Sequence, residues 1–166
     1  GNAPAGAPPP GLDWEQWVGP APMRPFHELI VRDAYYHCSF MAFSGGWTPG
    51  MAPHLVDLPF WALDLDFPTT TSCSGGRTTI RDVGDVPDTQ EAVWQFGSTV
   101  LTWSMSLVNS FGFDFGRGSR ERRIGIYFHG VNGTLICDYG RLEVVPEGDR
   151  LPEPDREPPP PSLPPS

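Results

Sequence analysis

The chain has 166 residues, of which 39% are hydrophobic and 12% aromatic, enough to build the packed core of one domain. Its formal net charge is -9, and all 11 of its basic residues are arginines. This acidity disfavours binding to a phosphate backbone or an anionic bilayer, so we expect neither nucleic acid nor membrane among the partners. The absence of lysine excludes a lysine Schiff base, a lysine general base and a phosphate-loop lysine within these residues.

Proline usage divides the chain into three parts, because 15 of the 21 prolines lie in residues 1–25 or 151–166. We predict a Pro/Gly-rich lead-in with a short helix over residues 1–25 and an ordinary globular domain over residues 26–150. Residues 151–166 are expected to be a disordered or polyproline tail.

The lead-in contains one helical pattern, LDWEQWV at residues 12–18, with Asp13 as the expected N-cap and Gly19-Pro20 as the stop. The opening GNAPAGAPPPG lacks the charged and apolar regions of a signal peptide. We therefore expect these residues to lie inside a longer protein. The sequence leaves its compartment open, cytoplasmic or periplasmic.

A second helical pattern follows a Gly/Pro-rich turn in the stretch GGWTPGMAPHLVDLPFWAL, residues 45–63. Residues 54–63 suit a helix, with Pro53 at its first position and Pro59 as a kink or restart. Residues 28–43 favour neither helix nor strand.

Beyond Pro68 the pattern changes to short runs rich in β-branched and aromatic residues, typical of strands. Gly97-Ser98 and Asn132-Gly133 are the turn signals between some of them. The expected strands are residues 69–72, 91–96, 99–107, 124–128, 134–139 and 142–145. Sequential short strands with tight turns predict an α+β fold, a largely antiparallel open sheet with the earlier helices on one face.

The principal candidate for chemistry is the pair formed by His54 and Asp57, which a helix would place on one face. Histidine exchanges protons near neutral pH, and a nearby carboxylate would orient its ring. The alternative is structural, since an aspartate near a helix start is favoured without any catalytic role. The spacing alone leaves both interpretations open.

The remaining candidates have competing structural explanations. The histidines and cysteines lack metal-ligand spacing, and the three cysteines suit small buried positions better. The Arg117–Arg123 cluster suits either an anion site or a solvated loop, and the Asp82–Asp88 series suits an acidic turn. Trp94 and Trp103 suit either sugar stacking or core packing. The run FGFDFGRGS lacks the dinucleotide-binding spacing. The residues concerned are His27, His37, His129, Cys38, Cys73, Cys137, Arg117, Arg120, Arg122, Arg123, Asp82, Asp85 and Asp88.

A series of motifs carries a family resemblance: LDWEQWVGPAP, the GG turn followed by PHLVDLPFWAL, SGGR, PDTQEAVWQF and GVNGTLICDYG. In this order, from about Leu12 to about Pro146, they resemble the C-terminal domain of the Gfo/Idh/MocA oxidoreductases. The resemblance implies a substrate-binding and oligomerisation domain, paired through its sheet into a homo-oligomer. A separate Rossmann domain, absent from these residues, would bind NAD or NADP.

The resemblance also implies roles for individual residues. His54 matches the family's histidine, the acid/base on a hydroxyl of a sugar or polyol, and Asp57 matches a supporting acidic position on the same helix. The family's aspartate often lies four residues before the histidine, where this chain has Gly50. The family's Glu-Lys-Pro lysine is absent, so we expect this chain alone to be inactive and to bind no dinucleotide.

Two other functions compete with the oxidoreductase. Gly50 and the missing lysine favour a non-catalytic binding or assembly domain that retains the fold. Trp94 and Trp103 would suit a free-standing carbohydrate-binding β domain.

Overall fold

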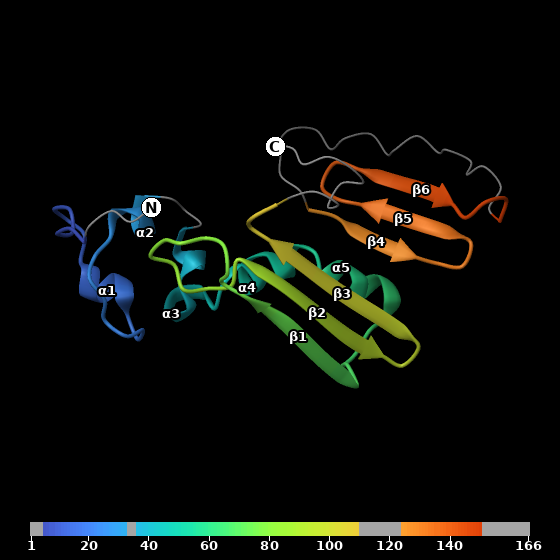
Figure 1. The fold of residues 1–166 in the computed structure, drawn as a ribbon, viewed down its shortest axis with the longest axis horizontal. Helices are drawn as coiled ribbons and strands as arrows, with labels where there is room; N and C mark the ends of the chain where they lie inside the picture. The colour runs from blue at the N-terminus through green and yellow to red at the C-terminus, as the bar shows by residue number, and fades with distance from the viewer. Residues whose placement is uncertain (1–4, 33–35, 110–123, 151–166) are drawn as a thin grey trace.

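Helices precede strands along the chain. The computed structural model describes residues 5–32, 36–109 and 124–150 (Figure 1). The helices are α1 (Trp14–Val18), α2 (Glu28–Arg32), α3 (Met41–Ser44), α4 (Trp47–Met51) and α5 (Asp57–Leu63), with two 3₁₀ turns, η1 (Tyr36–Ser39) and η2 (Ala52–His54).

The strands form two antiparallel sheets of three strands each (Figure 1). The first sheet has the order β1 (Thr70–Gly76), β2 (Thr89–Phe96) and β3 (Thr99–Ser106), and the second has β4 (Ile126–His129), β5 (Gly133–Cys137) and β6 (Leu142–Pro146). Tight turns at the predicted Gly97-Ser98 and near Asn132-Gly133 join neighbouring strands, so each sheet is a simple meander.

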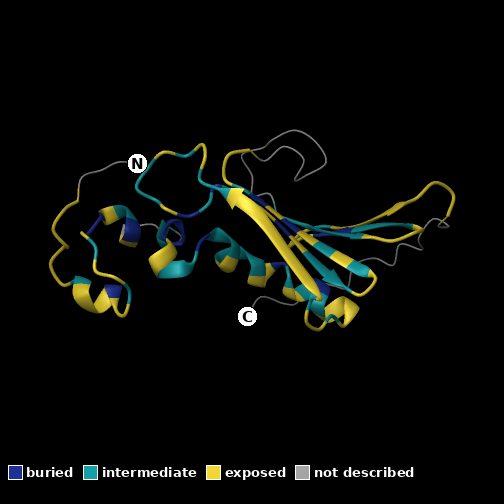
Figure 2. Ribbon diagram, turned by 60° about the horizontal axis from the view of Figure 1, so that its bottom comes forward, coloured by how far each residue is buried: buried dark blue, intermediate teal, exposed yellow. Residues whose placement is uncertain are grey.

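The first sheet carries the main core on the face that meets the α4–α5 segment. Ala92 on β2 is paired with Trp103 on β3, and both form one buried cluster with Met105 and Leu55. The helical layer lies along one face of the first sheet in Figure 2. Because side chains alternate along a strand, the opposite face presents exposed residues such as Thr102 and Ser104. The alternation of side chains along each strand therefore gives the sheet one face covered by helices and one face rich in hydroxyl groups.

A hydrogen-bonded chain ties the helical layer to this sheet. The indole Nε1 of Trp103 donates to Thr48 Oγ1 at 3.0 Å, and Thr48 Oγ1 donates to Gln90 Oε1 at 2.6 Å. Trp103 can therefore be buried without leaving its N–H unpaired, which would carry a desolvation penalty of about 1–3 kcal/mol.

The lead-in helix forms as its sequence predicts. Asp13 caps α1 by accepting the backbone N–H of Gln16 at 3.0 Å, and Gly19 ends the helix with a positive φ of 57°. The Trp14 ring then packs edge-on against Phe26, with centroids 5.2 Å apart. Aromatic packing therefore joins α1 to the chain that follows.

The α+β class, the antiparallel pairing and the helical layer on one face are confirmed. The division into two sheets is a difference from the single open sheet expected. The predicted helix over residues 54–63 begins instead at Asp57, because Leu55 leaves the helical region with φ -128°. Pro59 is accommodated at the third position of α5, where the backbone N–H has no intrahelical partner.

Candidate functional site

The candidate catalytic histidine lies at a solvent-exposed bend in the helical layer. His54 is the last residue of η2 and is separated from α5 by two residues, and its side chain is exposed. The chain turns before α4 at Gly45 and Gly46, which adopt φ of 73° and 107°. Glycine adopts such positive φ angles without steric cost. A general acid/base must reach its substrate, and this position leaves the His54 ring accessible.

Asp57, the predicted partner of His54, begins α5 and is also exposed. Neither a hydrogen bond nor an ion pair joins it to His54 in the described part of the chain. Its position in the first turn of α5 is one at which the helix dipole favours a negative charge. The role of Asp57 in holding the His54 ring stays a prediction.

The side chain that does contact His54 is Tyr139, in the turn between β5 and β6. The two rings meet edge to face, with centroids 6.4 Å apart and an interplanar angle of 83°. Tyr139 belongs to the GVNGTLICDYG motif, but nothing local in the sequence indicated that it would reach His54. The contact unites the helical layer with the second sheet.

Gly50, at the position of the family's aspartate, faces a buried thiol. A Cβ atom added at Gly50 would lie 3.1 Å from Cys38 Sγ, and Cys38 is 4% exposed. The His37 Nε2 atom lies 3.7 Å from the same sulfur. A larger residue at position 50 therefore requires Cys38 to move.

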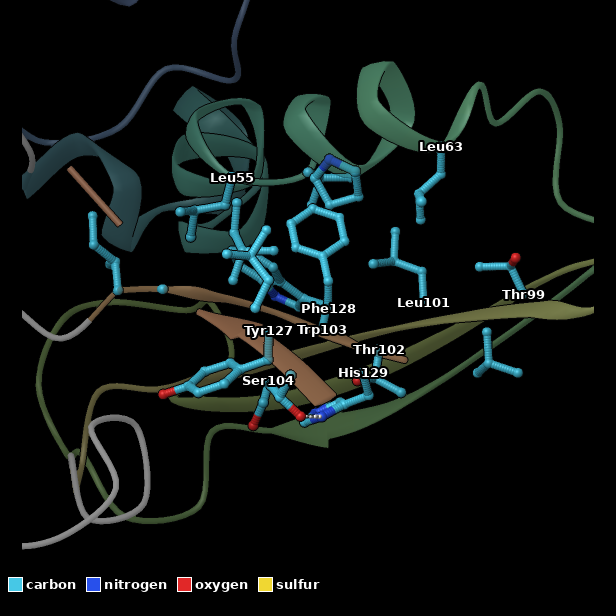
Figure 3. Close-up of a pocket in the computed structure, with 18 of the residues that line it drawn as sticks. Leu55, Leu63, Thr99, Leu101, Thr102, Trp103, Ser104, Tyr127, Phe128 and His129 are labelled. Atoms are coloured by element: carbon cyan, nitrogen blue, oxygen red, sulfur yellow. Dashed lines mark hydrogen bonds between the residues drawn. The ribbon is translucent and has the colours of Figure 1, made fainter. Parts of the chain in front are cut away.

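An apolar groove of about 1190 Å³ runs between β3 and β4, close to this bend (Figure 3). Leu55, Leu101, Trp103 and Phe128 are among its apolar lining residues, and neither His54 nor Asp57 lines it. Polar side chains also line the groove: His129 Nδ1 lies 3.0 Å from Thr134 Oγ1. The groove can hold an apolar group, but it is separate from the candidate catalytic pair.

The predicted acidic turn is a folded loop held by its carboxylates. Asp88 is fully buried and accepts the backbone N–H groups of Thr78, Thr79 and Ile80 at 3.1, 2.7 and 2.7 Å. The N–H of Ile80 is the main cause that lowers the pKa of Asp88, against the opposing effect of desolvation, and the other two N–H groups and Arg77 act in the same direction. Asp88 is therefore a structural anion.

The same loop is attached to the helical layer. Arg77 forms an ion pair with Asp82 and donates to the Val86 carbonyl at 3.0 Å, and Asp85 accepts the Met41 N–H at 2.7 Å. Burial raises the pKa of the nearby Tyr36 hydroxyl, and the Asp82 carboxylate acts in the same direction. These contacts hold the loop together and join it to α3, as expected of an acidic turn.

The tryptophans and cysteines considered in the sequence analysis lie partly in the core and partly on the surface. Trp103 is buried and Trp94 is half-buried against the same core, as core packing requires, whereas Trp61 on α5 is 82% exposed. All three cysteines are free thiols; Cys38 and Cys137 are buried, while Cys73 is exposed. Burial raises the pKa of Cys137, with Asp138 adding to the effect, which keeps this thiol protonated.

No group of three or more metal-ligating side chains occurs in the residues the structure describes. The arginine cluster (Arg117, Arg120, Arg122 and Arg123) and the run FGFDFGRGS lie outside those residues. No described helix is both long and apolar enough to cross a bilayer.

Comparison with known proteins found no matching family model, no matching curated protein and no matching solved structure.

Proposed function

We propose that this chain is the substrate-binding and oligomerisation domain of an NAD(P)-dependent oxidoreductase that acts on a hydroxyl of a sugar or polyol. The observation that carries the proposal is the ordered motif series, whose central histidine is presented to solvent on the helical layer. The outward face of the first sheet, with exposed Val93 and Val100 among its hydroxyl side chains, suits the expected homo-oligomer contact.

The described residues do not fit a nicotinamide dinucleotide. Every strand pair among them is antiparallel, whereas dinucleotide sites are built on parallel βαβ units. We therefore place NAD or NADP on another part of the intact protein, and this chain provides only the substrate side of the reaction.

In this proposal His54 binds the reacting hydroxyl and takes up its proton as the carbon is oxidised, then returns the proton in the reverse direction. Asp57 stabilises the protonated imidazole through its charge. The remainder of the chain positions this pair on a helical layer packed against a sheet.

The test is turnover of the intact protein over a panel of aldoses, polyols and cyclitols with NAD⁺ and with NADP⁺. We expect one substrate class to be oxidised, and His54→Ala to lower kcat by about 10²–10⁴-fold, the usual contribution of a general acid/base. His54→Asn, which keeps a hydrogen-bonding side chain without the titrating group, should lose a similar factor.

A second function is favoured by Gly50, which lacks the family's carboxylate and where an added Cβ would lie 3.1 Å from Cys38 Sγ, as suits an assembly domain without chemistry. In that case wild-type protein and His54→Ala would show the same turnover, at background level, over the whole panel. Turnover that disappears with His54 would reject the assembly role.

A further inference from the structure

The contact between His54 and Tyr139 joins two segments that are remote in sequence. Among the described residues, it is the only hydrogen bond, ion pair or ring contact that His54 makes. Both side chains are exposed, and Tyr139 retains 65% of its accessible surface. The pair therefore forms an open surface site to which the helical layer and the second sheet each contribute one ring.

The geometry is that of an attractive aromatic pair. Edge-to-face rings are favoured at centroid separations of about 4.5–7 Å, because the positive edge of one ring faces the negative face of the other. The observed 6.4 Å and 83° fall within this arrangement. Since the His54 side chain has no other such partner among the described residues, the Tyr139 ring limits the orientations that the imidazole can adopt.

The position of Tyr139 is itself fixed by a tight turn. Asp138 donates its N–H to the Arg141 carbonyl at 3.0 Å, and its Oδ1 atom accepts the Gly140 N–H at 2.8 Å. The hydrogen bonds of β5 and β6 begin at once on either side, with Cys137 paired to Leu142. Tyr139 thus lies in a hydrogen-bonded turn between two paired strands, which defines the position of its backbone.

We propose that Tyr139 is a positioning residue for His54, in place of the local orientation by Asp57 that the sequence suggested. The inference rests on the proposed function. Edge contact with Tyr139 holds the plane of the imidazole in the orientation that meets the substrate hydroxyl. The role belongs to the aromatic ring, so phenylalanine can perform it and an aliphatic residue cannot.

The experiment compares Tyr139→Phe with Tyr139→Leu in the intact protein. We expect Tyr139→Leu to lower kcat about 10-fold with little change in KM, because a misoriented acid/base weakens the reaction more than substrate binding. Tyr139→Phe should keep kcat within about 2-fold of wild type. Phe67→Leu is the matched control, since Phe67 is an exposed ring (88%) without a ring contact in the described residues.

A second readout does not depend on activity. In protein with ¹³C-labelled histidine, the His54 ring resonances, assigned with His54→Asn, should move in Tyr139→Leu through loss of the ring current. They should stay near their wild-type positions in Tyr139→Phe and in Phe67→Leu.

The outcomes separate the two proposals. Unchanged His54 resonances or unchanged kcat in Tyr139→Leu overturn the positioning role. A loss of kcat in Tyr139→Phe equal to that in Tyr139→Leu also overturns it, since the hydroxyl would then be the active part. Absence of any turnover in wild type rejects the oxidoreductase, and the resonances still decide whether the Tyr139 ring packs against His54.

Discussion

Two acidic regions of the molecule use their carboxylates in opposite ways. In the loop that ends at Asp88, the carboxylate is buried and receives three backbone N–H groups. At the His54 bend, Asp57 is exposed and makes neither a hydrogen bond nor an ion pair with a described side chain. The strongly partnered carboxylate therefore serves the fold, while the candidate functional one lies exposed on the surface.

The largest effect is expected from removing the buried carboxylate. Asp88→Ala would leave three backbone N–H groups unsatisfied inside the protein, and we expect a fall in Tm of about 10 °C. Asp57→Ala, the matched substitution at the exposed site, should lower Tm by about 2 °C or less, the loss of a favourable helix-start charge. Thermal unfolding followed by circular dichroism measures both. Equal losses would break the contrast between the two regions.

The stabilising effect of the Asp88 carboxylate should also appear in the pH dependence of stability. Because the pKa of Asp88 is lowered in the folded state, its stabilising contribution is complete above the unfolded pKa of about 3.9. That contribution is lost as the pH falls towards the lower folded value. We therefore expect Tm to fall on acidification below about pH 4, and Asp88→Asn to have a smaller slope in that range.

The control for this measurement is the wild-type protein over the same pH range. A wild-type slope in Asp88→Asn would show that other carboxylates govern acid unfolding.

The smallest effect concerns the packing between Gly50 and Cys38. Gly50→Ala should stabilise α4 by about 1 kcal/mol, because alanine has the higher helix propensity. Its Cβ, however, would lie too close to Cys38 Sγ, at 3.1 Å. In a Cys38→Ala background the Sγ atom is absent, so this steric conflict is removed. We expect Gly50→Ala to be more favourable there than in wild type by about 1 kcal/mol, measured as a double-mutant cycle by urea unfolding. Additive effects would mean that the thiol does not restrict position 50.

Local signals predicted much of the fold. The Asp13 cap and Gly19 stop of α1, and the turns at Gly97-Ser98 and Asn132-Gly133, depend on neighbours in sequence. The periodicity of residues 99–107 likewise placed β3 almost to its ends. Such features could be predicted because their physical causes lie within a few residues.

The site could be predicted only in part, because its contacts are not local. His54 and Asp57 were identified by spacing and by resemblance, yet the ring beside His54 comes from the turn between β5 and β6, remote in sequence. Likewise, Asp88 has the sequence pattern of a solvated turn, and only the folded loop brings three N–H groups to it. Tertiary approach of distant residues carries no signal in a single sequence.

The groove between β3 and β4 has a consequence for the solubility of the chain. Among the described residues β3 pairs only with β2, and β4 only with β5, so each presents one edge of unpaired backbone N–H and C=O groups. Such edges are templates for intermolecular β pairing, and β3 lacks the lysine or proline that commonly protects them. Within the described part of the chain the outer strands β1 and β6 have an unpaired edge as well, so β3 is one of several edges at which such pairing can begin. A single lysine in place of Thr102 should delay the aggregation that begins at β3.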